Sequence, residues 1–338
     1  MSAALASQQA VKGVDLGTSR IVLATLNGET VTYNLQLNAF VELPYSKMTE
    51  QMLLRENILH RVEGAHIYAY GNRADEFAKF LAGDARRPMQ SGLLNPAEPK
   101  NLQMLEMLLE GMCGRASKGE KLCLSIPSAP SEHGSDLIFH ERSTRAIFEK
   151  LGYQAQSVNE GLAIVYAELK DANFTGIGMS FGGGMCNICL AYLGLPVFTV
   201  ATTRAGDYID QSAASVTGET PTTVRLHKEN PAESGFGLDG ATGGSIDRAL
   251  SVYYSDVIDT AVTALASAMA DSKKLPRFIG PIPIVCAGGT AMARNFLPRL
   301  KSAIVAADLP VAISEVYLAK DPMNATAKGA LVGAMLNM

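Results

Sequence analysis

The sequence predicts an α/β protein that is built from two related lobes. The chain has 338 residues, which exceeds the size of a typical single domain. Patterns typical of strands alternate along it with patterns typical of helices, as in the α/β class. A unit of strand, glycine turn and strand occurs near residues 13–26 and again near 176–193, and each is followed later by a helix rich in small residues. This repetition predicts two lobes that face each other.

The composition supports well-filled cores and argues against a nucleic-acid partner. Hydrophobic residues make up 47% of the chain and charged residues 18%, so disorder is not expected over most of its length. The formal net charge is −4, and no run of Lys and Arg reaches the density expected of a nucleic-acid groove.

The cysteines and the apolar stretches indicate a cytoplasmic protein. The odd number of five cysteines favours reduced thiols. Cys186 and Cys189 lie in a predicted strand, where positions i and i+3 face opposite sides, so core packing is favoured over a shared metal. No apolar stretch approaches the roughly 20 residues that span a bilayer. The first dozen residues lack the long apolar region of a signal peptide, so no signal peptide is predicted. The sequence neither supports nor excludes contact of the protein with a membrane surface.

The first half of the chain contains these expected elements. A strand, a tight glycine turn and a second strand cover residues 11–26, and the dipeptide Asn27-Gly28 predicts a hairpin into a strand over 29–35. Residues 45–70 have a mixed pattern and receive no assignment. Helical spacing predicts helices over 73–81, 101–113 and 141–151, and short strands are expected over 121–126 and 156–158.

The second half continues the alternation. Helices are expected over 161–169, 209–216 and 325–336, together with a long helix whose apolar face runs from Tyr254 to Met269. Strands are expected over 174–179, 185–193 and 281–286. Residues 217–245 contain Pro221, Pro231 and many glycines, which predicts an irregular small insertion.

The first candidate for chemistry is the segment GVDLGTS, residues 13–19. A strand brings Asp15 to a tight turn, where Gly17 lets the backbone approach a phosphate closely. Backbone N–H groups and the hydroxyls of Thr18 and Ser19 can grip phosphate oxygens, and Asp15 can hold Mg²⁺ through water. The alternative is an ordinary hairpin turn with a surface Asp.

The second candidate is the segment GMSFGGG, residues 178–184. Three consecutive glycines between apolar strands lose much conformational entropy on folding, and a plain hairpin turn needs only one or two. Close approach to a ligand explains the excess, and a flexible loop tip is the alternative.

The third candidate is IVCAGGTA, residues 284–291, where a buried strand passes through Gly288 and Gly289 into a helix start. This element is compatible with nucleotide binding, but it is also a common turn of α/β proteins.

The fourth candidate is NEGLAIVYA, residues 159–167, with Glu160 at the start of a helix of small residues. The functional interpretation is a base that orients water. The alternative is a carboxylate that stabilises the helix dipole.

In their order and spacing, these segments together resemble the signature motifs of the actin-like ATPase superfamily. The segment ATAKGALVGA, residues 325–334, resembles the second connecting helix of that superfamily, and the resemblance covers nearly the whole chain. Three further segments resemble the MreB and MamK branch of bacterial actins: RRPMQSG at 86–92, SIPS at 125–128 and AGDYID at 205–210.

The resemblance implies a two-lobed actin-like fold with ATP and Mg²⁺ in the cleft between the lobes. Lobe I is expected over 10–160 plus 320–338 with a small subdomain at about 32–84, and lobe II over 161–319 with a small subdomain at about 206–244. Glu160 and Asp15 are the implied catalytic residues, with Asp15 also holding Mg²⁺. The implied nucleotide-binding residues are Gly17, Thr18, Ser19, Ser180, Gly182, Gly183, Gly184, Asp207, Lys228, Gly288, Gly289 and Thr290.

The chain departs from the superfamily's pattern at two positions. Ser180 stands where the superfamily usually has an Asp that organises the Mg²⁺ shell and the attacking water. Ser keeps a hydrogen-bonding group but loses the charge, which predicts slow hydrolysis. Where MreB has a Glu-x-x-Lys pair for the ribose, this chain has RLHK at 225–228, so only Lys228 carries over.

The resemblance favours an ATPase that polymerises with itself into cytoskeletal filaments. A non-polymerising ATPase, either a chaperone-like reactivation factor or a regulatory module, is the alternative. A small-molecule kinase on the same fold is a third hypothesis, but neither an acceptor pocket nor an Asp base is evident in the sequence.

Overall fold

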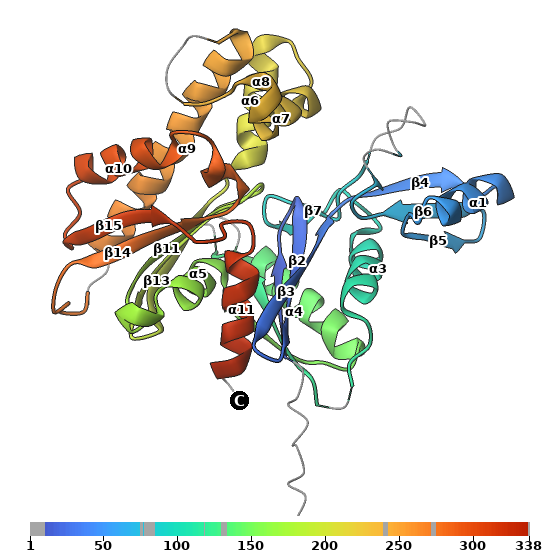
Figure 1. Ribbon diagram of the computed structural model, residues 1–338, viewed down its shortest axis with the longest axis horizontal. Helices are drawn as coiled ribbons and strands as arrows, with labels where there is room; N and C mark the ends of the chain where they lie inside the picture. The colour runs from blue at the N-terminus through green and yellow to red at the C-terminus, as the bar shows by residue number, and fades with distance from the viewer. Residues whose placement is uncertain are drawn as a thin grey trace, which may run out of the picture.

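The computed structural model describes residues 11–74, 77, 85–117, 119–129, 134–238, 243–271 and 275–336. It has two lobes, each built on a five-stranded sheet (Figure 1). The first-lobe sheet contains β1 (Val11–Leu16), β2 (Arg20–Asn27), β3 (Thr30–Leu37), β9 (Lys121–Ile126) and β10 (Gln154–Asn159). The second-lobe sheet contains β11 (Gly176–Phe181), β12 (Cys186–Tyr192), β13 (Leu195–Thr202), β14 (Ile282–Ala287) and β15 (Ile313–Leu318).

The two sheets have the same topology. Their strand orders are β10-β9-β1-β2-β3 and β13-β12-β11-β14-β15. In each sheet three consecutive strands form an antiparallel meander, and two later strands add in parallel beside its first strand. The α/β class and the repeated unit predicted from the sequence are therefore confirmed.

The first-lobe sheet buries both faces, because its side chains alternate between them. Val14 and Leu16 face a core shared with α3 (Asn101–Cys113) and α4 (Gly134–Lys150). Val11 and Val22 face a second core, shared with α5 (Glu160–Glu168) and α11 (Ala325–Leu336).

The second-lobe sheet also has helices on both faces. One face packs on α6 (Gly206–Thr217), α9 (Ser245–Asp271) and α10 (Phe296–Ala306), and the other packs on α5. Helices α5 and α11 therefore lie between the two sheets, at the centre of Figure 1. Cys186 and Cys189 belong to different cores, as predicted for opposite strand faces, and all five cysteines are buried and free.

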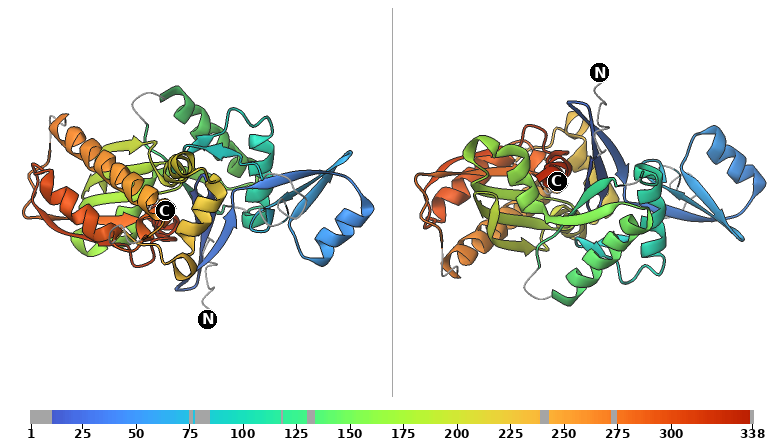
Figure 2. Two further views of the ribbon diagram at one scale, coloured as in Figure 1. Left: turned by 90° about the horizontal axis from the view of Figure 1, so that it is seen from above. Right: turned by 90° about the horizontal axis from the view of Figure 1, so that it is seen from below.

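Smaller elements extend from each lobe, as the views in Figure 2 also show. Beside the first lobe lie β4 (Phe40–Pro44), α1 (Lys47–Arg55), β5 (His60–Glu63) and β6 (His66–Tyr70), with a sheet order of β4-β6-β5, followed by the short pair β7 (Met89–Gln90) and β8 (Leu93–Leu94). The second lobe carries α7 (Pro221–Glu229) and α8 (Pro231–Ser234) next to α6, and short 3-10 helices lie at η1 (Lys170–Ala172) and η2 (Gly289–Met292).

The prediction of an irregular segment over 217–245 is wrong in its first part, because α7 and α8 occupy it. The Thr220 side chain caps α7 by accepting a hydrogen bond from Thr223 N, and Pro221 takes the first helical position, where no N–H is needed. Helix α4 begins earlier than predicted, and α9 contains the long apolar face predicted from Tyr254 to Met269. The helix predicted over 73–81 falls largely outside the described residues.

No helix in the described part of the chain is long and apolar enough to cross a bilayer.

Candidate functional site

A cavity of about 430 Å³ lies between the two lobes. Its walls come from the turns after β1, β11 and β14 and from the starts of α5 and α6, together with α7. All of the site residues predicted from the sequence line it: Asp15, Gly17, Thr18, Ser19, Glu160, Ser180, Gly182, Gly183, Gly184, Asp207, Lys228, Gly288, Gly289 and Thr290. The structure thus brings these distant segments together, and their roles toward a ligand remain predictions.

The turn after β1 is tight and needs glycine. Gly17 N donates a hydrogen bond to Arg20 O at 3.1 Å, and a Cβ on Gly17 would lie 2.7 Å from that same oxygen. At the end of β1, Asp15 accepts a hydrogen bond from Ser125 Oγ at 2.8 Å. Ser125 comes from the neighbouring strand β9, so the two strands together fix the carboxyl group at the cavity.

The glycines of the turn after β11 have a partner within the chain. A Cβ on Gly183 would lie 2.4 Å from Ser19 Oγ, and one on Gly184 would lie 2.3 Å from Thr18 Oγ1. The two loops therefore touch across the cavity. The sequence predicted that these glycines let a ligand approach the backbone closely. In the structure, Ser19 and Thr18 of the first loop come close enough to explain why glycine is needed at Gly183 and Gly184.

Hydrogen bonds also hold the turn after β11. Gly182 O accepts from Gly206 N at 3.0 Å and from Thr290 Oγ1 at 2.9 Å, and Gly183 O accepts from Asp207 N at 2.7 Å. The start of α6 and the turn after β14 thus fix the carbonyl groups of the loop.

The turn after β14 also requires a glycine. Gly288 has a φ of +95°, and a Cβ there would lie 2.3 Å from Phe181 O. The element that follows is the 3-10 helix η2, and the longer helix α10 begins only at Phe296.

Two carboxyl groups lie in the cavity, Glu160 buried and Asp15 half-buried. Burial raises the pKa of Asp15, and the hydrogen bond from Ser125 opposes that shift. Burial raises the pKa of Glu160 further, the negative charge of Asp15 adds to the increase, and hydrogen bonds from Ser180 and Asn187 oppose it. Acids held in this way suit a site that receives positive charge.

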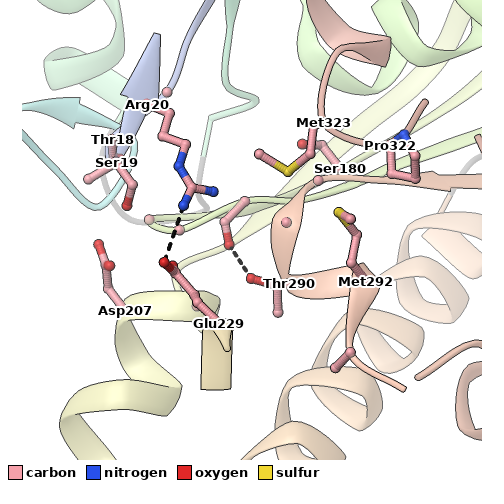
Figure 3. A pocket seen from close by; sticks show the side chains of 18 of the residues that line it. Thr18, Ser19, Arg20, Ser180, Asp207, Glu229, Thr290, Met292, Pro322 and Met323 are labelled. Carbon is pink, nitrogen blue, oxygen red and sulfur yellow. Dashed lines mark hydrogen bonds and ion pairs between the residues drawn. The ribbon is translucent and has the colours of Figure 1, made fainter. Parts of the chain in front are cut away.

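Charged pairs lie at and beside the cavity wall. Lys228 is buried with Asp210, at 2.7 Å between Nζ and Oδ1, and also donates to Gly206 O at 3.2 Å. In Figure 3, Arg20 and Glu229 point toward each other from opposite walls, at 3.2 Å. Arg87 Nη1 lies 3.1 Å from Asp207 Oδ1 and also donates to Ser19 Oγ at 3.2 Å.

The sequence did not identify Arg20, Arg87, Ser125, Asn187 or Glu229 as site residues. For Arg87 and Ser125 a signal was present, since they lie in the segments RRPMQSG and SIPS, which resemble the MreB and MamK branch. Asn187 stands out as an amide within an apolar strand. Arg20 and Glu229 gave no such signal, because their importance depends on which segments meet in space.

A family model described as Volactin matches residues 10–334. The chain belongs to the Volactin family. A search of curated proteins finds no significant match, so the further comparisons of this Volactin-family chain are with solved structures.

The solved structures show the fold of the actin-like ATPase superfamily in its bacterial actin form. A MamK double helical filament has a TM-score of 0.71 and 17% identity, with 96% of this chain and 98% of that chain covered. MreB5 of Spiroplasma citri bound to AMPPNP has a TM-score of 0.62 and 14% identity, with coverage of 98% and 97%. The ethanolamine utilization protein EutJ from Carboxydothermus hydrogenoformans has a TM-score of 0.56 and 16% identity, with coverage of 96% and 89%. The resemblance predicted from the motifs is confirmed.

Proposed function

We propose that this protein binds ATP between its lobes, hydrolyses it slowly and polymerises with itself into filaments in the cytoplasm. The observation that carries the proposal is that three glycine turns and two carboxyl groups with raised pKa values converge on one cavity. Backbone N–H groups in such turns suit phosphate oxygens. The related MreB5 structure is described as bound to AMPPNP, which supports a nucleotide as the ligand.

The residues present fit Mg²⁺ as a partner of the nucleotide. Asp15 and Glu160 are cavity acids with raised pKa values, and a cation nearby would stabilise their charged forms. Within the described ranges no group of three or more His, Cys, Asp or Glu side chains could hold a metal ion. Mg²⁺ usually keeps several waters, so Asp15 would hold it through water. When bound, the ion would neutralise charge on the phosphates.

Glu160 is proposed to orient the attacking water. Its carboxyl group lies in the same cavity as Asp15 and both phosphate-type loops. Phosphoryl transfer depends mainly on positioning and electrostatics, so one oriented carboxyl group can supply much of the protein's contribution. Ser180 donates a hydrogen bond to Glu160 but brings no charge of its own, which is the reason to expect slow turnover.

Filament formation is supported by similarity to MamK. The MamK structure with a TM-score of 0.71 to this chain is described as a double helical filament. ATP binding that favours one lobe arrangement would then couple to assembly, because subunit contacts select between conformations that already exist.

The proposal is tested with purified protein, wild type and Asp15→Ala. Phosphate release is measured with Mg-ATP, and assembly by pelleting and electron microscopy. Wild type should hydrolyse ATP and form filaments, and Asp15→Ala should lose hydrolysis. Equal rates in the two proteins would refute the site. Hydrolysis by monodisperse monomers across a wide range of concentration and salt would refute polymerisation and leave a non-polymerising ATPase.

A further inference from the structure

Asn187 is a fully buried amide in the apolar strand β12. Its neighbours Cys186 and Ile188 are apolar and completely buried. A buried amide without partners costs about 1–3 kcal/mol. Here both polar atoms of the side chain have a partner, and one of those partners is Glu160.

The orientation of this amide is determined by its contacts. Ser128 N lies 2.7 Å from Asn187 Oδ1, and a backbone N–H can only donate. The acceptor must therefore be the amide oxygen. Asn187 Nδ2 is left to donate to Glu160 Oε2, at 3.0 Å. Turning the amide over would place two donors together at Ser128 and two acceptors together at Glu160.

The contacts of Asn187 connect the two lobes at Glu160. Asn187 belongs to the second-lobe sheet, whereas Ser128 follows β9 of the first-lobe sheet. Ser128 Oγ accepts from Asn159 Nδ2 at 2.7 Å, and Asn159 Oδ1 in turn caps α5 by accepting from Gly161 N. Glu160 is thus held through its backbone by Asn159 and through its carboxyl group by Asn187, and both of these residues contact Ser128.

We propose that Asn187 is a positioning residue for hydrolysis, one that fixes the carboxyl group of Glu160 in the cavity. By occupying Oε2, the amide leaves the other acceptor positions of the carboxylate for Ser180 and for a water. This inference rests on the proposed role of Glu160. Because the anchor of the amide lies in the other lobe, the orientation of Glu160 also depends on how the lobes sit relative to each other.

The competing explanation is that Asn187 only stabilises the fold. A double-mutant cycle of Asn187 and Glu160 separates this explanation from a positioning role. If Asn187 acts through Glu160, Asn187→Ala should lower kcat roughly 10- to 100-fold, with KM for ATP changed little. In a Glu160→Gln background the same substitution should lower kcat very little further. If the two losses multiply, or if Asn187→Ala leaves kcat unchanged, the inference is wrong.

A second variant, Asn187→Asp, tests the same contact if Asn187→Ala fails to fold. The carboxylate can still accept from Ser128 N, but its other oxygen then opposes Glu160. Without nucleotide and at pH 9, above the pKa of about 8 that burial gives Glu160, this variant should unfold at a lower temperature than wild type, and Glu160→Gln should recover most of that loss because Gln can donate to Asp. Independent, additive shifts in the unfolding temperature would count against the contact.

The matched control is Ile188→Val, at the next position of the same strand. This side chain is fully buried in the core shared with α9. The change should cost about 0.5–1.5 kcal/mol of stability without altering kcat. If Glu160→Gln slows turnover and Asn187→Ala does not, only this inference fails. If wild type does not hydrolyse ATP, or Glu160→Gln turns over at the wild-type rate, the proposed role of Glu160 and this inference fail together.

Discussion

Ser180 differs from the other residues of the cavity in lacking a charge where the superfamily usually carries one. The Ser180→Asp variant would add a carboxylate beside Asp15 and Glu160. Three acids close together attract a divalent cation more strongly than two do. The variant should therefore reach half-maximal hydrolysis at a lower Mg²⁺ concentration than wild type, or turn over faster. Phosphate release across a Mg²⁺ titration measures both quantities.

The control for this charge change is Ser302→Asp, at an exposed position on α10. It adds the same charge away from the cavity and should leave the Mg²⁺ titration unchanged. An Mg²⁺ dependence of Ser180→Asp that matches wild type, with no gain in rate, would contradict the assigned role.

Glu160 should make the stability of the nucleotide-free protein depend on pH. Burial raises its pKa from 4.5 to about 8, so between these values the folded state holds a proton that the unfolded chain has released. The free energy of unfolding must then fall as pH rises through this window. Glu160→Gln has no such proton and should show a flatter profile. The variant should therefore gain stability relative to wild type between pH 5 and pH 8.

Unfolding temperatures measured with a chelator present test this, since bound Mg²⁺ would stabilise the carboxylate. Glu149→Gln, at an exposed position on α4, is the control and should run parallel to wild type. Parallel curves for Glu160→Gln would mean that Glu160 is ionised in the folded protein at neutral pH.

At the scale of elements, α5 and α11 cross at a contact that only glycine allows. A Cβ on Gly329 of α11 would lie 1.7 Å from Ala163 O, which is backbone of α5. Gly329→Ala should therefore push the helices apart and cost about 1–3 kcal/mol, the typical cost of overpacking. Thermal unfolding should show a clear decrease in the midpoint.

Gly333, one turn further along α11, provides the comparison. A Cβ there would meet Cys123 Sγ at 3.6 Å, an ordinary van der Waals contact. Gly333→Ala should be neutral or stabilise the protein by up to about 1 kcal/mol, because alanine favours the helix. Equal effects of the two substitutions would contradict the close crossing.

The elements that sequence reasoning predicted well are those with a strong local pattern. The ranges 101–113, 121–126 and 325–336 match α3, β9 and α11. The strand β13 was missed because it pairs only with β12 and carries Pro196. Helix α10 was missed because Pro298 lies within its first turn, where proline is tolerated but interrupts the sequence pattern.

The predicted cavity residues other than Lys228 were recognisable because each lies in a motif with a glycine or at a helix start. The contacts among them were not, since Asn187 reaches Glu160 only when β12 lies beside the start of α5. At the scale of the whole molecule, the predicted boundaries of the lobes remain predictions. The structure adds that β3 belongs to the main first-lobe sheet, and that the separate three-stranded sheet beside it begins with β4.

Two ion pairs join the lobes above the cavity. Arg20 from the first lobe reaches Glu229 of α7, and Arg87 reaches Asp207 of α6. All four side chains are partly exposed, and such pairs are worth about 0–1 kcal/mol each. The two pairs therefore favour the arrangement in which the lobes contact each other by only a small free energy. Modest changes in charge should then shift the population of lobe arrangements.

The double variant Arg20→Gln with Arg87→Gln removes both pairs while keeping side chains of similar polarity. Without nucleotide, its lobes should separate more often than those of wild type. The radius of gyration from small-angle X-ray scattering should then be larger for the variant. Salt at about 1 M, where the Debye length is about 3 Å, should shift wild type in the same direction and leave the variant nearly unchanged.

Arg145→Gln supplies the control, because Arg145 pairs with Glu149 within the single helix α4. Breaking that pair removes a surface ion pair without touching the cleft, so the scattering profile should not change. If wild type and the double variant scatter identically at both salt concentrations, the ion pairs do not hold the lobes together. The direct contacts of Thr18 and Ser19 with the glycines of the second loop would then be sufficient to keep the cleft closed.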